Sequence, residues 1–316
     1  MKRNLLVLAI ALLAVAFVSC QKDGVYKPKK KIAKIICNWE ERTSYDTTKV
    51  NDYVSEEFVW GKKTIDKRIH SFRKFNYVTN TESFPTIEYT YSYDDKNRLI
   101  GMREDSFNFE YIYNDDKRLS NINVYDGTDT ASTVELGYED KHVSSLKITE
   151  YYYSNKSQAA LAMILPSHMV SVIYPEEINC GEIVPKDAST EVTDVTFEWD
   201  GKNISRMVSK SDKITTTATY EYDGKINPFA GFYSDESISY AMFSKNNVTK
   251  ITTTRTIVLS TLTTKEETTE DIVYEYDGNV PASAKTTRVT NTEMTGLVTA
   301  KQTTTKVTNE KYEYTK

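Results

Sequence analysis

The chain repeats one short phrase in which two aromatic residues at positions i and i+2 are followed at once by an acidic or amide turn. The clearest copies are Tyr91-Ser92-Tyr93-Asp94 and Tyr111-Ile112-Tyr113-Asn114. Side chains two positions apart lie on the same face of a strand. Asp, Asn and Gly then supply the backbone geometry of a tight reversal. Each copy therefore predicts the end of one strand, a hairpin turn and the start of an antiparallel neighbour.

Looser copies of the phrase run along most of the chain. They begin at Leu136, Phe197, Tyr220 and Tyr274, an early relative spans Phe58 to Gly61, and Tyr312 to Tyr314 reads as the first half of another. The spacing between copies varies, which fits pairs of strands of unequal length rather than an exact solenoid. The 23 Tyr and the frequent Thr also suit pleated, half-buried surfaces. The pattern predicts an all-β antiparallel meander.

The last third of the chain predicts long strands. Residues 250–263 read as a strand, Lys265–Glu267 as its turn and residues 268–276 as the return strand; residues 284–292 and 297–308 form a second hairpin around Met294–Gly296. Thr alternates only loosely with Val, Ile and Leu in these segments. We therefore expect one wet face and a thin contact with the core.

One stretch interrupts the pattern. Ser157–Leu165 is the best helical window after the leader, and Pro166 stops it. Pro and Gly then indicate irregular backbone as far as about Thr190. We predict a single β-sheet domain over residues 32–316, with an irregular insertion at about 154–190 that holds one short helix.

The N-terminus reads as an export signal. Lys2 and Arg3 precede the apolar run Leu5–Val18, so residues 1–19 have the layout of a signal peptide. The run is shorter than the roughly 20 residues that a membrane helix needs. Phe17–Cys20 resembles a bacterial lipobox, which predicts Cys20 as the lipid attachment site and residues 20–31 as a tether. The alternative is a simple secreted protein.

Composition limits the remaining chemistry. The net charge of −5 argues against a nucleic-acid binder, which needs a basic stripe. Cys37 and Cys180 could form a disulfide in an oxidising compartment, or both could be small buried side chains. We expect no cofactor-binding and no metal-binding residues, because no phosphate loop, zinc motif or nucleophile elbow occurs.

Residues for catalysis are also not apparent. The histidines lie far apart and are predicted as surface or interface residues: His70, His142 and His168. Adjacent carboxylates on a strand point to opposite faces, so we predict solvated turn residues for three pairs: Glu40-Glu41, Glu176-Glu177 and Glu266-Glu267. Tyr151-Tyr152-Tyr153 could stack on a ligand, but a strand with its outer members in the core is favoured. We expect no catalytic residues and no enzyme.

The leader, the repeated phrase and the segment Tyr220–Phe229 together resemble an uncharacterised Bacteroides-type surface lipoprotein family, described as a domain of unknown function with a porin-like fold. In that segment Asn227-Pro228 would set an extended turn and Phe229 would return to the core. The resemblance implies one wide, curved antiparallel sheet rolled into an incomplete barrel. It implies no activity and no site residues.

The sequence therefore predicts a cell-envelope lipoprotein of the outer membrane that could be exposed at the surface. We expect non-catalytic binding of an unknown small molecule, glycan or protein on the concave face, with the Ser157–Leu165 helix covering one opening. Contact with the membrane would come through the lipid, and no nucleic acid is expected. The alternatives are a scaffold or accessory lipoprotein of an envelope nutrient-uptake complex and, more remotely, a carboxylate-dependent hydrolase.

Overall fold

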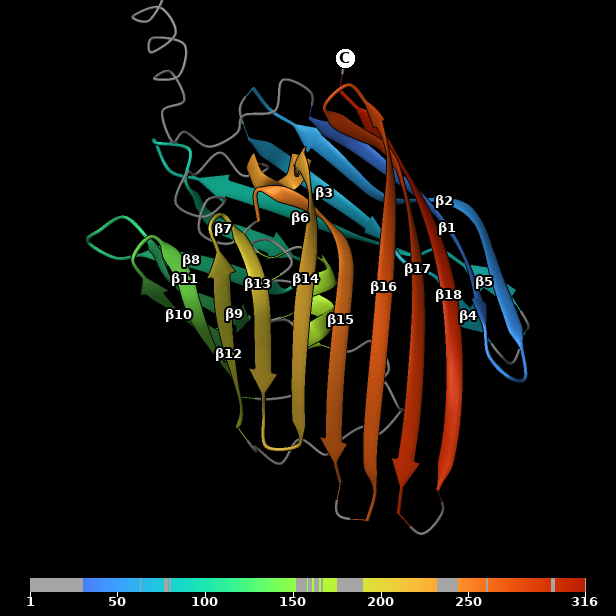
Figure 1. Ribbon diagram of the computed structural model, residues 1–316. Coiled ribbons are helices and arrows are strands. Elements are labelled where there is room, and N and C mark those ends of the chain that lie inside the picture. The colour runs from blue at the N-terminus through green and yellow to red at the C-terminus, as the bar shows by residue number, and fades with distance from the viewer. Residues whose placement is uncertain are drawn as a thin grey trace, which may run out of the picture.

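Sixteen antiparallel strands close into one barrel, and a two-stranded sheet, β4–β5, lies beside it (Figure 1). The computed structural model describes residues 31–62, 64–76, 79, 81–151, 158, 161, 165, 167–174, 190–231, 244–259, 261–296 and 299–315. Neighbours in the barrel are mostly neighbours in sequence, which confirms the predicted meander.

The first half of the chain holds β1 (Ile32–Arg42), β2 (Thr47–Trp60), β3 (Ile65–Ser71), β4 (Lys74–Asn76), β5 (Thr81–Ser83), β6 (Thr86–Tyr93), β7 (Leu99–Glu104), β8 (Phe107–Tyr113), β9 (Leu119–Asp126), β10 (Asp129–Glu139) and β11 (His142–Glu150). The second half holds α3 (Ser167–Ile173), β12 (Glu191–Asp200), β13 (Asn203–Lys210), β14 (Ile214–Ile226), the 3-10 helix η2 (Pro228–Gly231), β15 (Asn246–Val258), β16 (Thr263–Asp277), β17 (Val280–Thr295) and β18 (Ala300–Tyr314).

The barrel is closed, so the expected incomplete barrel is wrong. The first and last strands, β1 and β18, pair along their length from Ile32 opposite Tyr314 to Arg42 opposite Thr305. Pairing satisfies the backbone groups that two long edge strands would otherwise leave open to aggregation. The final Tyr312–Tyr314 segment is therefore not half of an interrupted hairpin. It completes the ring.

Aromatic side chains of the repeated phrase form hydrogen bonds between neighbouring strands along one rim of the barrel. The second aromatic of most copies donates a side-chain hydrogen bond to a backbone carbonyl at the start of the preceding strand in the sheet. These bonds are Trp60 to Ile32 (2.7 Å), Tyr93 to Ile65 (2.8 Å), Tyr113 to Leu99 (2.9 Å), Tyr138 to Leu119 (2.7 Å), Trp199 to Val143 (2.8 Å), Tyr222 to Ile204 (2.7 Å) and Tyr314 to Pro281 (2.7 Å). We call this end of the barrel the clasped rim.

Basic residues reinforce the clasped rim. The Arg98 guanidinium lies 4.8 Å from the centre of the Tyr113 ring, and the Arg118 guanidinium lies 5.3 Å from the centre of the Tyr138 ring. Such cation–π contacts contribute about 0.5–1 kcal/mol each at exposed sites. In these two copies the Arg that ends the phrase therefore covers the aromatic ring of a later copy.

Two turns of the clasped rim make a matched test of backbone strain. Asn97 and Lys117 both adopt a φ of 63°, in the left-handed region that favours Gly and tolerates Asn. We expect Lys117→Gly to stabilise the protein by about 0.5–1 kcal/mol, because the β-carbon is the source of the strain. Asn97→Gly should gain less. Denaturant unfolding measures both, and a larger gain for Asn97→Gly would contradict this account.

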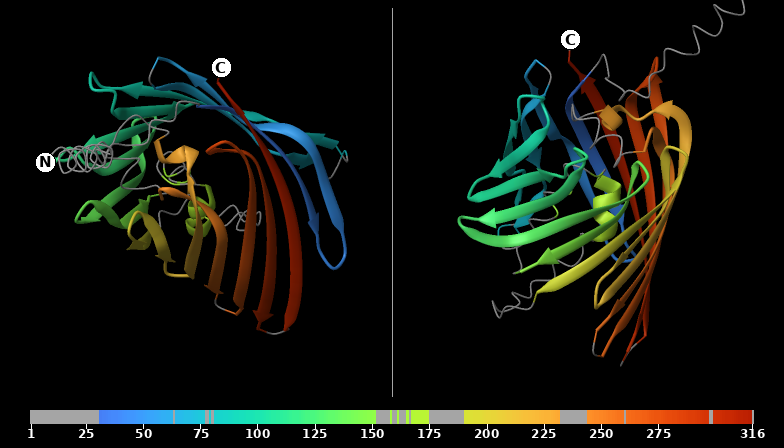
Figure 2. Two further views of the ribbon diagram at one scale, coloured as in Figure 1. Left: turned by 45° about the horizontal axis from the view of Figure 1, so that its top comes forward. Right: turned by 90° about the vertical axis from the view of Figure 1, so that its left-hand side faces the viewer.

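Helix α3 lies inside the barrel and fills part of it (Figure 2). It occupies residues of the predicted irregular insertion that follow the expected Ser157–Leu165 helix. Most of the expected Ser157–Leu165 helix lies outside the described residues. Leu165 does donate a backbone hydrogen bond of helical spacing to Leu161 (2.7 Å).

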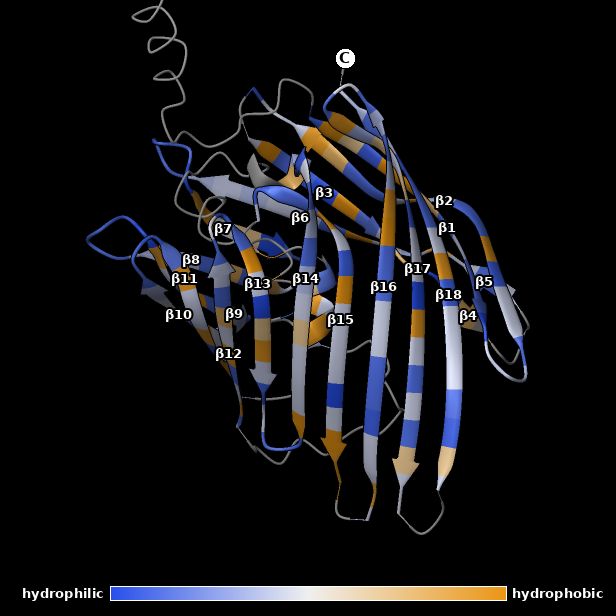
Figure 3. Cartoon of the chain, in the orientation of Figure 1, coloured by the Kyte–Doolittle hydropathy of each residue, from blue (hydrophilic) through white to orange (hydrophobic). Residues whose placement is uncertain are grey.

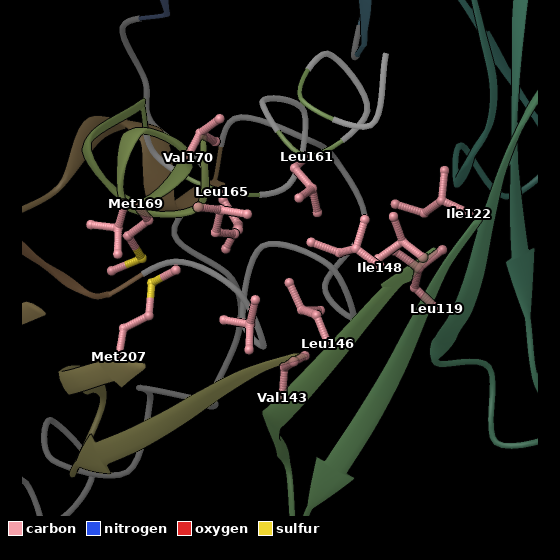
Figure 4. Close-up of a cluster of buried hydrophobic side chains, with 14 of the residues drawn as sticks. Leu119, Ile122, Val143, Leu146, Ile148, Leu161, Leu165, Met169, Val170 and Met207 are labelled. Carbon is pink, nitrogen blue, oxygen red and sulfur yellow. The ribbon is translucent and has the colours of Figure 1, made fainter. Parts of the chain in front are cut away.

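The apolar core is formed by α3 and the inward faces of strands β1–β3 and β6–β15. Met169 of α3 faces Met207 of β13, and Leu146 and Ile148 of β11 lie farther along the same cluster (Figure 4). All four side chains are almost fully buried. Phe229 also packs against this core, as predicted. The Asn227 side chain accepts a hydrogen bond from the Phe229 N–H (3.0 Å).

The outer face of the barrel is charged. On β16 five of the six exposed residues are charged, namely Lys265, Glu267, Asp271, Glu275 and Asp277, and the sixth is Val273 (Figure 3). Ion pairs join outward residues of neighbouring strands elsewhere. Examples are Lys34 with Glu57, Lys67 with Glu88, Arg206 with Glu198 and Lys301 with Glu293. A lipid-facing barrel carries an apolar outer band instead. Within the described ranges, none of the helices has the length and apolar character of a membrane span.

Candidate functional site

A polar chamber lies inside the barrel between α3 and the long strands β15–β18. It is lined by Glu41, Ser171, Val172, Thr253, Arg255, Glu266, Thr268, Glu270, Arg288, Thr290, Thr304 and Lys306. The cavity volume is about 80 Å³, and the space is about 730 Å³ when the open solvent at its mouth is included. Glu266 lies near the start of β16, whereas β16 reaches the clasped rim at its other end. The chamber is therefore in the half of the barrel farther from that rim.

Strand register arranges the lining residues in three parallel rows that cross the sheet. The first row joins β1, β18, β17 and β16 through Glu41, Lys306, Arg288 and Glu270. The second joins β18 to β15 through Thr304, Thr290, Thr268 and Thr253. The third joins β17 to β14 through Thr292, Glu266, Arg255 and Thr216, and its two middle residues line the chamber. Rows on one face of a sheet are roughly 7 Å apart and strands about 4.8 Å apart.

Arg255 is the most tightly bound charged side chain of the chamber. Its Nη1 lies 2.8 Å from Glu266 Oε2, and the two side chains are only 14% and 8% exposed. Its Nε also donates to Thr216 Oγ1, and its Nη2 donates to the carbonyl oxygen of Ser171 in α3, both at 3.4 Å. The guanidinium therefore joins the third row to the interior helix.

The charged row is held less tightly. Arg288 Nη2 lies 3.1 Å from Glu270 Oε1, and the Arg288 side chain is 31% exposed. The Lys306 ammonium lies 4.7 Å from the centre of the Trp39 ring. In the pairing of β1 with β18, Lys306 is the residue opposite Glu41. The acidic and basic side chains of the lining balance one for one. The chamber therefore offers many hydrogen-bonding groups and no excess of either charge.

The middle row consists of threonines. Thr268 and Thr290 share a hydrogen bond between their hydroxyls (3.0 Å). Each hydroxyl has one donor and two acceptor positions, so this bond leaves capacity on both residues. The row ends at Ala218, which lies opposite Thr253 and belongs to the apolar core.

A second polar cluster lies inside the barrel on β2 and β3. Arg68 Nε donates to Glu56 Oε2 (2.7 Å), and His70 Nδ1 lies 2.9 Å from Glu56 Oε1. Burial alone would raise the pKa of Glu56, but Arg68 and His70 more than offset it and hold this pKa at about 2. Nearby, burial raises the pKa of Glu310, which accepts a hydrogen bond from Tyr312 (2.7 Å). These groups satisfy one another and do not line the chamber.

The cysteine predictions lie mostly beyond what the structure describes. Cys20, the predicted lipid attachment site, and Cys180 lie outside the described residues, as do residues 1–30. Cys37 is buried on β1, where burial raises the pKa of its thiol to about 11. The pairing of Cys37 with Cys180 stays a prediction.

The three histidines have different environments. His142 lies at the clasped rim, edge-on to the Trp199 ring with the ring centres 4.3 Å apart. His70 belongs to the Glu56 cluster, so neither residue is a simple surface group. His168 of α3 packs against Tyr220, and its Nε2 is buried with no hydrogen-bond partner among the described residues. The expected surface position is wrong for His168, because α3 lies inside the barrel.

The carboxylate pairs lie in strands rather than in turns. Glu41 and Glu266 line the chamber, whereas Glu267 is exposed and Glu40 pairs with Arg42. The rule that adjacent side chains point to opposite faces is confirmed, but the interpretation of these pairs as solvated turn residues is wrong. Glu176 and Glu177 lie outside the described residues.

The expected turn at Lys265–Glu267 lies instead at Leu259–Leu262, where Leu259 N–H bonds to the Leu262 carbonyl (2.8 Å). Tyr151 is 41% exposed beyond β11, so it does not face the core. Tyr152 and Tyr153 lie outside the described residues. The chamber residues on β16 were missed because the Lys-Glu-Glu run reads locally as a turn, although Thr264, Glu266 and Thr268 continue the inward alternation.

Comparison with known proteins identifies no family for this chain. No family model matches the chain, and no curated protein matches it. Among solved structures, a loop L8 deletion mutant of OmpT, an outer membrane protein of Vibrio cholerae, overlaps 90% of this chain and 99% of its own, with 7% identity and a TM-score of 0.24. Among the described residues, no cluster of His, Cys, Asp and Glu is arranged to hold a metal ion.

Proposed function

We propose that this chain is a lipid-anchored protein of the cell envelope that binds a polar ligand, without transforming it, in the polar chamber. The observation that carries the proposal is the lining: twelve residues, nearly all polar, face one space inside an otherwise closed barrel. Ligand sites are concave and hold a few convergent polar groups on a rigid scaffold. The paired arginines and glutamates meet that requirement.

The position of the chamber also supports this role. Lys31, the first described residue, accepts a hydrogen bond from Thr315 N–H (2.8 Å), and its ammonium lies over the Trp60 ring at the clasped rim. A tether ending at Cys20 would thus hold that rim toward the membrane. The chamber would then lie in the half of the barrel directed away from the lipid.

The acid spacing argues for binding rather than glycoside hydrolysis. Glycosidases place two carboxyl groups about 5–10 Å apart around the bond they break. Glu266 and Glu270 are four residues apart on one strand, which separates their Cα atoms by roughly 13 Å. Glu41 is three strands from Glu270, also on the order of 14 Å along the sheet. Arginines hold two of these three acids.

The proposal can be tested by filling the chamber. Thr290→Trp places a large ring among the lining residues, whereas Thr287→Trp places it on the outer face of the same strand. Thermal unfolding would be measured with maltotriose, xylotriose, arginine, citrate and inorganic phosphate. A ligand at a hundredfold excess over its Kd stabilises a protein by about 2.7 kcal/mol.

We expect at least one of these compounds to stabilise the wild type and Thr287→Trp but not Thr290→Trp. If none stabilises the wild type, or if the effect survives in Thr290→Trp, the chamber is not the binding site.

A further inference from the structure

We infer that the ligand of the polar chamber is a neutral, hydroxyl-rich chain, of the chemical class of a short oligosaccharide, lying along the threonine row across strands β15–β18. This inference rests on the proposed binding function and specifies its ligand. Three features carry it: the compensated charges, the hydroxyl row and the closed end of that row.

Four of the six charged side chains that line the chamber neutralise one another in pairs. Glu266 holds Arg255 at 2.8 Å, and Glu270 holds Arg288 at 3.1 Å. An anionic ligand would have to share an arginine with a carboxylate that is about 90% buried, and a cationic ligand would face the same arginines. Separating a buried pair leaves an uncompensated charge and is strongly unfavourable. A neutral ligand avoids this cost.

Paired charges remain good partners for hydroxyl groups. A guanidinium in an ion pair still has N–H groups to donate, and a carboxylate still has free lone pairs. Rows of such pairs flank the threonine row on both sides, about 7 Å away on each. A sugar hydroxyl both donates and accepts, so it can bridge a threonine and a neighbouring charged group. Groups held in place before binding lose little entropy when the ligand arrives.

The threonine row has a defined length. Thr304, Thr290, Thr268 and Thr253 come from successive strands, so hydroxyl-bearing residues recur about every 4.8 Å over roughly 14 Å. That period is comparable to the length of one sugar ring. The row stops at Ala218, where the apolar core begins, and Ser171 and Val172 of α3 line the same space. The row therefore accommodates two or three sugar units rather than a long polymer.

The test compares matched probes and matched variants. Calorimetric titration would use maltotriose, xylotriose, cellotriose and mannotriose as neutral probes. Trigalacturonic acid, the glucosamine trimer and inorganic phosphate would be the charged probes. We expect at least one neutral trisaccharide to bind at least tenfold more tightly than every charged probe. Its affinity should change little between low and high salt, because no net charge is neutralised.

Two variants remove hydroxyls without changing shape. Thr268→Val with Thr290→Val should weaken the neutral trisaccharide by about ten- to a hundredfold, since each lost hydrogen bond costs up to about tenfold. Thr269→Val with Thr287→Val makes the same change on the outer face of the same strands and should leave the affinity unchanged. Thermal unfolding of both double variants verifies that they fold.

The outcomes separate the inference from the proposed function. Tighter binding of trigalacturonic acid, the glucosamine trimer or phosphate, lost in Thr290→Trp, would overturn the neutral ligand and leave the chamber as a binding site. Equal loss of affinity in the inner and outer double variants would also overturn the inference. If no probe binds, both the inference and the proposed function fail.

Discussion

We expect Arg255→Met to lower the free energy of unfolding by about 3–5 kcal/mol, the usual cost of removing one partner from a buried ion pair. Glu266 is only 8% exposed, so without Arg255 its carboxylate would be buried and uncompensated. The change also removes the hydrogen bond from Arg255 to the Ser171 carbonyl, which fastens α3 to the barrel wall. Guanidinium unfolding followed by circular dichroism measures the effect.

The double variant Arg255→Met with Glu266→Leu distinguishes charge from packing. Replacing both partners by apolar residues of similar size is often close to neutral, so most of the lost stability should return. Lys301→Met serves as the control, because its pair with Glu293 is exposed and should cost less than about 1 kcal/mol. A double variant less stable than Arg255→Met alone would show that the pair is not the source of the effect.

The local parts of this fold are predictable from sequence because the repeated phrase encodes short-range chemistry. Asp94 Oδ1 accepts hydrogen bonds from the N–H groups of Lys96 and Arg98, so this turn is specified within five residues. Alternating aromatics likewise fix the face of each strand. Closure is different. The pairing of β1 with β18 joins the two ends of the domain, and no local pattern determines whether a curved sheet stops short or meets itself.

The chamber was not predictable for a related reason. Arg255 and Glu266 meet only because the turn lies at Leu259–Leu262, which sets them opposite each other. A turn placed at Lys265–Glu267 would put Glu266 in solvent. The available signal was weak: inward-facing positions of β15–β18 repeatedly carry Thr, Arg or Glu where a packed barrel would carry aliphatic residues. Reading it requires the register, which one sequence does not supply.

The stability of the protein should fall in acid because of His168 in α3. Burial lowers the pKa of His168 from 6.5 to about 4, and the ring packs on Tyr220 with the centres 5.7 Å apart. Between these two pH values the unfolded chain binds a proton that the folded chain does not. Stability from this residue is therefore complete above about pH 6.5 and is lost as the pH falls toward 4. A shift of this size corresponds to roughly 2–3 kcal/mol by pH 4.5.

His168→Phe keeps an aromatic ring in α3 and removes the proton site, so the variant should lose about 2–3 kcal/mol less stability than the wild type between pH 7.5 and 4.5. The difference between the two proteins is the quantity to measure, because other groups titrate as well. The raised pKa of Glu310 acts with the opposite sign just above pH 4.5, and Glu56 contributes mainly between pH 4.5 and 2. Both contributions are common to the two proteins and cancel in the difference.

His142→Phe, at the clasped rim, should change the dependence of stability on pH less than His168→Phe does. Parallel pH profiles for the wild type and His168→Phe would mean that water or a proton already reaches the interior helix in the folded state.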